Sequence, residues 1–266
     1  MDMNGEPHGI WANGELRKFG CKPRVAKVGS VAGVPVADDW IIPRTDWEEF
    51  EDDESIFWHQ YDQDGYGSCN AEAATGCVLV VREFVGLPRN VLSPADLYRR
   101  INDGVDQGSL VADAILELAR SGIADTSVFP EQKWNAPVPA GWAANAKQYK
   151  ALEWLDAPTF DHIGSLVQRR FPIDSGIMIG QDNFEPNAAG VIPYPPRGRQ
   201  GGHAMCNCLG MKRIGGVWHL KTKNSWGQWG LNGWCWIPEP YWNGAFNDAF
   251  GLRVVTYSNL NLIRVR

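Results

Sequence analysis

The chain has 266 residues and a formal net charge of −6, and 44% of its residues are hydrophobic while 21% are charged. It is long enough for one large domain or two compact lobes around a hydrophobic core. The acidic balance provides no basic surface to attract nucleic acid or anionic lipid, so we expect neither as a partner.

Residues 1–41 contain short apolar pieces between Gly and Pro, without helical periodicity, and we interpret them as an extension rather than a domain. The N-terminus lacks the basic start and apolar core of a signal peptide. The chain also contains no run of 18 apolar residues that could span a membrane. These features predict a cytoplasmic protein, or one incorporated in an assembled particle.

Residues 46–54 hold seven acidic side chains in nine positions. A charge run of this kind predicts a solvated loop or helix face, while a docking role is the alternative.

A helix is predicted to begin at about Cys69, because apolar residues recur at three- and four-residue spacing from there to Val85. A thiol at a helix start faces unpaired amides and the positive end of the helix dipole, which favour the nucleophilic thiolate. The alternative interpretation is that Cys69 is a small buried hydrophobic residue.

Two further helices are predicted in the first half. Ser93 is typical of an N-cap and Pro94 of a first helical position, and a second apolar pattern starts near Val111 and stops at Gly122. Residues 126–150 are loop-like, and one more short helix precedes Pro172. Beyond that proline, short β-type runs dominate. The pattern predicts an α+β fold of two lobes that meet at a cleft.

The six cysteines form no CxxC pairs of the zinc-binding type. Cys206 and Cys208 are two apart in an apolar run, so they share one face of a strand. Buried free thiols are favoured over a metal site or a disulfide. The sequence therefore predicts no metal and no cofactor.

His203 has the best context among the five histidines, because two glycines precede it at the entry to a β run and leave room for a close backbone approach. Asn224 ends the next β run. They follow Cys69 by 134 and 155 residues, close to the spacing of a Cys, His, Asn site with an N-terminal cysteine.

Four ordered motifs make this pattern specific, and together they resemble the papain-like family of cysteine peptidases. A glutamine precedes the cysteine by six positions, and the Asn-Ser-Trp-Gly segment is unchanged. The matching segments are Gln63 to Cys69, Gly202 to Met205, Asn224 to Gly227, and Trp229 to Trp234. Residues 42–47 resemble the mature start of the family, which extends the match over residues 42–257. The chain is identified as a divergent cytosolic member, bacterial or phage-like, without a propeptide.

The resemblance implies a papain-like two-lobe fold. A helical lobe would cover about residues 42–150 and a β-barrel-like lobe about 151–257, with the active-site cleft between them and residues 258–266 as a tail. It also implies a cysteine protease that hydrolyses peptide bonds through a thioester acyl-enzyme.

The resemblance assigns a role to each matching residue. Cys69 would be the nucleophile, and His203 would protonate the leaving amine and later activate water. Asn224 would orient the imidazole. Gln63, with the Cys69 amide, would stabilise the oxyanion, and Trp226 would shield the Asn–His hydrogen bond.

Substrate binding is assigned in the same way. Gly108 and Ser109 are similar to the family's strand that pairs with the substrate backbone, and Leu110 and Val111 would line the second subsite. An apolar substrate side chain is therefore expected there. Trp226 completes the predicted substrate-binding set.

Three positions depart from the family pattern: Tyr66 stands where a disulfide cysteine is usual, Asn70 replaces a tryptophan, and Gly202 replaces Asp or Asn. Residues 1–41 also lack the pattern of an inhibitory helical propeptide, so control is expected to come from elsewhere. Our hypothesis is that residues 1–41 and the C-terminal tail dock the enzyme onto a protein assembly.

Two alternatives to an endopeptidase follow from the sequence. One is a papain-fold structural or binding component of a larger assembly, such as a virus particle, with catalysis secondary or lost. The other takes the 13 tryptophans as stacking platforms for glycan, which would make the protein an amidase on cell-wall peptides.

Overall fold

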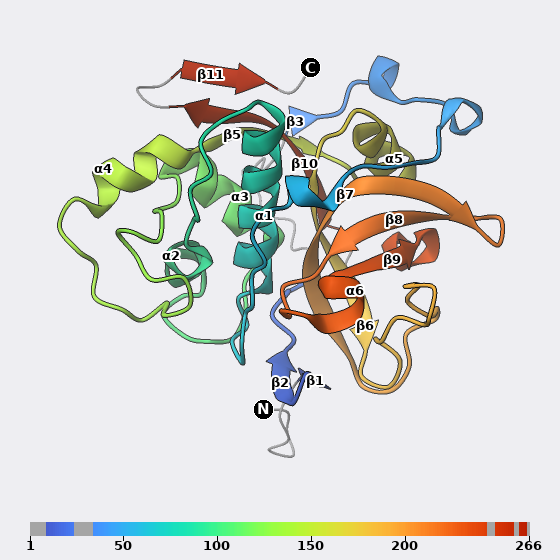
Figure 1. Ribbon diagram of the computed structural model, residues 1–266, viewed down its shortest axis with the longest axis horizontal. Helices are drawn as coiled ribbons and strands as arrows, with labels where there is room; N and C mark the ends of the chain where they lie inside the picture. Colours follow the sequence, from blue (N-terminus) through green and yellow to red (C-terminus); the bar gives the residue numbers. More distant parts are fainter. Residues whose placement is uncertain (1–8, 24–33, 244–247, 258–260, 265–266) are drawn as a thin grey trace.

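The computed structural model describes residues 9–23, 34–243, 248–257 and 261–264, so the predicted N-terminal extension and C-terminal tail lie partly outside the described residues. Helices α2, α3 and α4 lie on one side of the molecule and a large sheet with α5 and α6 on the other, with the long helix α1 between them (Figure 1). The α+β architecture predicted from the sequence is confirmed.

The helices begin and end close to the predicted positions. Helix α1 starts at Cys69, the Ser93 hydroxyl caps α2 by accepting from the Asp96 amide at 3.1 Å, and Gly122 follows α3 with a φ of +80°. The α-helices are α1 Cys69–Phe84, α2 Pro94–Ile101, α3 Val111–Arg120, α4 Trp142–Ala146, α5 Phe160–Gln168 and α6 Trp229–Asn232. Helix α4 falls in the stretch that the sequence predicts to be loop.

Nine strands form one sheet, in the order β3-β5-β10-β6-β7-β8-β9, with β11 on β10 and β4 on β7. This is an open path among the described strands, and the barrel-like form stays a prediction. Strands β1 and β2 form a separate hairpin. The strands are β1 Gly9–Ala12, β2 Glu15–Lys18, β3 Val34–Pro35, β4 Phe50–Glu51, β5 Ala151–Asp156, β6 Ile173–Gly180, β7 Gln200–Ile214, β8 Val217–Lys223, β9 Trp234–Pro238, β10 Asp248–Tyr257 and β11 Asn261–Arg264.

Helix α1 is the centre of the core. Of its 16 residues, the 14 from Cys69 to Arg82 are buried, because α2 and α3 cover one side of it and the sheet covers the other. It lies close against β7, where the Cys77 and Cys206 sulfurs are 3.5 Å apart. The predicted buried free thiols are found here, and all six cysteines are buried and unbridged.

The acidic stretch 46–54 is not simply solvated. The buried Lys221 amine lies 2.7 Å from carboxylates of both Glu51 and Glu54, and Arg170 lies 2.8 Å from Asp52. These acids neutralise cations of the sheet half that are far away in sequence, which periodicity could not reveal. Within the described residues, no helix has the length and apolar character needed to cross a bilayer.

Asp96 holds the helical half together. Its fully buried carboxylate accepts from Arg99 at 3.0 Å, Arg100 at 3.0 Å, the Ala124 amide at 2.9 Å and the Trp142 indole at 2.6 Å. The charge is therefore satisfied from α2, from α4 and from the turn after α3.

We predict that Asp96→Asn lowers the free energy of unfolding by about 3 kcal/mol, because it leaves two arginines without their buried anion. Urea unfolding of the full chain measures the change. Asp103→Asn, which removes an exposed carboxylate at a residue with positive φ that Asn tolerates, is the matched control. Equal unfolding midpoints for the two variants would contradict the central role of Asp96.

Candidate active site

Cys69 lies at the first position of α1, where the sheet half meets the helix. Its side chain has no exposed surface. Burial raises the pKa of its thiol to about 12, although the backbone amides of Ala204, Gly20 and Asn70 are directed at the sulfur and oppose that rise. The sulfur therefore touches the residue after His203 on β7, and it also touches the N-terminal segment.

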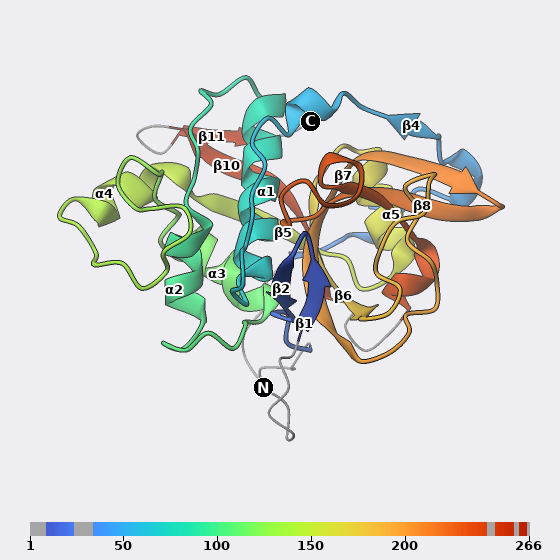
Figure 2. The same cartoon turned by 60° about the horizontal axis from the view of Figure 1, so that its bottom comes forward.

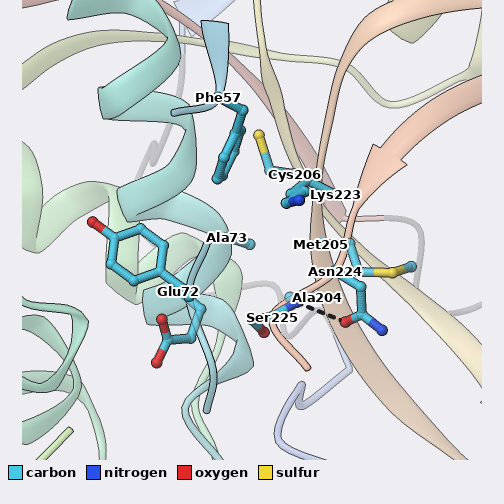
Figure 3. A pocket seen from close by; sticks show the side chains of 10 residues that line it. Phe57, Glu72, Ala73, Ala204, Met205, Cys206, Lys223, Asn224 and Ser225 are labelled. Atoms are coloured by element: carbon cyan, nitrogen blue, oxygen red, sulfur yellow. Dashed lines mark hydrogen bonds between the residues drawn. The ribbon is translucent and has the colours of Figure 1, made fainter. Parts of the chain in front are cut away.

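His203 and Asn224 form the second part of the site. His203 Nε2 lies 2.8 Å from Asn224 Oδ1, and because this oxygen only accepts, the ring proton resides on Nε2. Asn224 Oδ1 also accepts from the Ser225 amide at 2.9 Å, which fixes the orientation of the side-chain amide (Figure 3). The other ring nitrogen, His203 Nδ1, is buried without a hydrogen-bond partner among the described residues and is available to accept a proton.

Aromatic side chains seal the imidazole from water. The Trp226 ring lies 4.8 Å from that of His203, and Phe184 and Trp229 close the cluster, stacked on each other at 5.3 Å. Burial lowers the pKa of His203 to about 4, against the opposing effect of its bond to Asn224. Both the thiol and the imidazole are thus neutral in this structure.

Gln63 joins the same site. Its Oε1 accepts from the Trp226 indole at 2.9 Å, which turns its amide nitrogen toward the cleft. That nitrogen donates to the Tyr66 carbonyl at 2.7 Å and reaches the Lys18 carbonyl at 3.5 Å. The donor that the resemblance assigns to an oxyanion is therefore in contact with the N-terminal hairpin.

The N-terminal segment occupies the cleft between the two halves. The Ser109 amide donates to the Gly20 carbonyl at 2.9 Å, and the Lys22 amide donates back to the Ser109 carbonyl at 2.9 Å. On the other side, the Cys21 amide donates to the Gly202 carbonyl at 3.1 Å. Residues 20–22 thus form a strand that pairs with both halves at once, next to Cys69.

The β1–β2 hairpin anchors this segment and lies at the foot of α1, between the helices and the sheet (Figure 2). Buried Arg17 pairs with Asp62, and the Lys18 amine lies 2.5 Å from Asp106. Asn13, in the turn between the strands, donates to the Trp226 carbonyl at 3.0 Å. The hairpin is therefore held by both halves of the molecule.

Glycines make this close approach possible. A Cβ on Gly20 would lie 2.3 Å from the Gly67 carbonyl oxygen, and one on Gly108 would lie 2.1 Å from that of Gly20. Gly108 also has a φ of +74°, which disfavours other residues. Any side chain at Gly20 would therefore push the segment away from the cleft.

The predicted substrate-binding residues form two groups, one beside the N-terminal segment and one beside His203. Gly108 and Ser109 contact the segment through their backbones, and Leu110 and Val111 begin α3, buried beside them. Trp226 is fully buried against His203, so it has no surface for a substrate in this structure.

Several residues of the site were not identified from the sequence. Asn70, noted only as a departure from the family pattern, donates to the Ser109 carbonyl at 2.5 Å and so positions the pairing strand. Asp106 accepts from the Gly67 amide and the Tyr98 hydroxyl, each at 2.8 Å. Gly104 and Gly108, two positions to either side of Asp106, were the sequence signal for this loop. The contact of Asp106 with Gly67, 39 residues away, could not be predicted from that signal.

A cavity just large enough for one water molecule lies behind the site, between α1 and β7. Ala73 and Glu72 border it from the helix and Asn224 and Ser225 from the opposite wall (Figure 3). Glu72 is buried with one carboxylate oxygen unpartnered among the described residues, and burial raises its pKa well above the usual range. A carboxyl group whose protonated form is favoured by burial thus lies one helical turn from Cys69.

Comparison of the sequence with protein-family models found no match, and comparison with curated proteins found none either. Solved structures do resemble the chain. Xylellain, a cysteine protease from Xylella fastidiosa, aligns with a TM-score of 0.71 at 20% identity, over 91% of this chain and 96% of its own.

Two precursor structures are similar as well. Procathepsin B S9 from Trypanosoma congolense has a TM-score of 0.65 at 19% identity, covering 88% of this chain and 86% of its own. Digestive procathepsin L 3 from Tenebrio molitor larval midgut has a TM-score of 0.63 at 17% identity, covering 83% and 76%. These likenesses show that the chain has the papain-like fold.

We predict that Gly20→Val speeds alkylation of Cys69 by iodoacetamide at least about tenfold at pH 7.5, because the added side chain collides with Gly67 and exposes the sulfur. In the wild type the rate should be low at neutral pH and rise through the alkaline range, since the thiol pKa is about 12. Mass mapping separates Cys69 from the other cysteines.

Gly14→Asn is the matched control for this experiment. Gly14 lies in the hairpin that anchors the segment and has a φ of +80°, but a Cβ there meets no atom within 4 Å. This variant should react like the wild type. A folded Gly20→Val protein with wild-type alkylation kinetics would show that the segment does not shield the thiol.

Proposed function

We propose that this protein is a papain-like cysteine endopeptidase that its own residues 9–23 hold in a latent state. The observation that supports this most strongly is that Cys69, at a helix start, contacts the amide of the residue after His203, whose ring is oriented by Asn224 at 2.8 Å. The residues that cover this pair belong to the same chain. This differs from the sequence-based expectation that residues 1–41 supply no inhibitory helical propeptide and that control comes from elsewhere.

The proposed chemistry begins when the segment leaves the cleft. Water then reaches the site, which weakens the burial effects that keep both groups neutral. The Cys69 proton moves to His203 Nδ1, and the resulting thiolate is stabilised by the amides at the start of α1. Asn224 holds the ring in place through Nε2 during this transfer.

The thiolate attacks the carbonyl carbon of the peptide bond, and the carbonyl oxygen takes up the negative charge. The freed side-chain amide of Gln63 and the Cys69 amide donate to that oxygen. His203 gives its proton to the leaving amine as the C–N bond breaks, which leaves a thioester on Cys69. Water then loses a proton to His203, attacks the thioester and releases the acid and the thiol.

Hydrolysis of a fluorescently labelled unfolded protein, with the Gly20→Val chain as enzyme, tests this proposal. We expect turnover that Cys69→Ser or His203→Ala abolishes in the same background, and slower turnover by the wild-type chain. A thiol-directed epoxide inhibitor should label Cys69 in the active chain. An exposed, alkylatable Cys69 without any hydrolysis would argue against peptidase activity.

Gln63→Ala in the Gly20→Val background should lower kcat by about 100-fold, because one oxyanion donor is lost. Since Gln63 also accepts from Trp226, circular dichroism must first show an intact fold. Unchanged kcat in a folded variant would remove Gln63 from the mechanism.

The pH dependence of kcat/KM in the Gly20→Val background should be bell-shaped. Activity falls on the acid side as the thiolate is protonated and on the alkaline side as the imidazolium of His203 loses its proton. Both pKa values move on release of the segment, that of Cys69 downward and that of His203 upward, because burial had shifted them the other way. A profile with a single limb would contradict the ion pair.

A further inference from the structure

Two carboxylic acids are buried in the sheet beside the site. Asp174 of β6 and Asp248 of β10 are 0% and 1% exposed. Gly176 pairs with Asp248 and Phe250 with Asp174, so both acidic side chains project from the same face of the sheet. Neither oxygen of Asp174 has a hydrogen-bond partner among the described residues.

This face of the sheet is the one that carries the active site. In the pairing of β6 with β7, Asp174 is opposite Cys206 and Gly176 is opposite Ala204. Cys206 contacts Cys77 of α1, and the Ala204 amide is directed at the Cys69 sulfur. The two acids therefore lie on the α1 side of the sheet, next to the nucleophile and below the cleft.

Cys21 is the residue of the N-terminal segment on which these acids act. Its backbone pairs with Ser109 on one side and Gly202 on the other, and its side chain is 6% exposed. Burial raises the pKa of its thiol well above the usual range, and Cys69, Asp174 and Asp248 raise it further. The residue that pairs with Ser109 is thus within electrostatic reach of both acids, and here its side chain carries no positive charge.

Burying a carboxylate without a partner is unfavourable by several kcal/mol, so Asp174 is a group that requires either a proton or a cation. Burial first, and then the neighbouring Asp248, raise the pKa of Asp174 well above its ordinary value, which shows how strongly this position disfavours a bare carboxylate. The ammonium of Lys or the guanidinium of Arg would instead form charge-assisted hydrogen bonds there. Val111 and Ala204 belong to the same buried apolar cluster as Cys21, which favours the methylene groups of such a side chain.

We propose that Asp174 and Asp248 form the floor of the second subsite and select a substrate with Lys or Arg at the residue that pairs with Ser109. This inference rests on the proposed peptidase function. It replaces the apolar preference that Leu110 and Val111 suggest from sequence, because two acids of the sheet act on the residue that pairs with Ser109.

The first experiment uses the chain's own segment as the ligand and requires no catalysis. Two variants are compared: Cys21→Lys, and Cys21→Met, whose side chain has a similar length but no charge. Each is made in the chain with Asp174 and again in the chain with Asp174→Asn. We expect Cys69 to be alkylated about tenfold more slowly in Cys21→Lys than in Cys21→Met when Asp174 is present, and equally fast in the Asp174→Asn background. No advantage for lysine in the Asp174 background overturns the proposal.

The second experiment measures the substrate preference of the Gly20→Val chain. Two peptides that differ only in Arg or norleucine at the second position before the scissile bond are compared by kcat/KM. We expect a preference for Arg of at least about tenfold, which is lost in Asp174→Asn and retained in the control Asp39→Asn, where an exposed carboxylate is removed. A preference for norleucine overturns the proposal.

Asp248→Asn takes the place of Asp174→Asn if the latter fails to fold, and it should weaken the preference for Arg in the same direction. Cleavage of neither peptide would contradict the proposed function. In that case the alkylation rates of the Cys21→Lys and Cys21→Met chains still decide whether the subsite prefers a cation.

Discussion

The close packing of α1 against β7 is the constraint on which the rest of the molecule depends. The helix presents small residues to the strand, and a Cβ on Gly76 would lie 2.8 Å from the Phe57 ring and 3.5 Å from Cys206. Because helix and strand approach so closely, the first residue of α1 reaches the backbone beside His203. Larger residues on this face would separate Cys69 from the strand that carries His203, and so from the base that we propose for it.

The latency that we propose is as much electrostatic as steric. Residues 20–22 pair with both halves beside Cys69, and burial in this arrangement disfavours both a thiolate and an imidazolium. The proton therefore remains on sulfur, which is the wrong charge state for the proposed catalysis. Under this proposal, access to solvent and chemical activation are the same event, and a short segment without helical structure is enough to control the site.

The sequence predicted those parts of the site that follow from local pattern. The start of α1, the Ser93 cap and the order of Cys69, His203 and Asn224 could be identified because periodicity, capping and motif spacing are local or ordered along the chain. The pairing of Cys21 with Ser109 and Gly202 could not, since it depends on the final positions of three distant segments. Asp174 was missed for a related reason: one acid in an apolar strand does not reveal which face it occupies or whether a cation is near.

The orientation of the Gly20 peptide groups bears on how long the chain keeps its N-terminal cover. Gly20 offers its N–H group to the Cys69 sulfur, while its carbonyl is turned away and engaged by the Ser109 amide at 2.9 Å. The Cys69 sulfur therefore faces the hydrogen of this peptide group, and the Gly20 carbonyl oxygen is already held by Ser109. Under the proposed function, this orientation protects the covering strand from the chain's own sulfur, so each molecule would keep its cover until the hairpin detaches or another molecule cuts it.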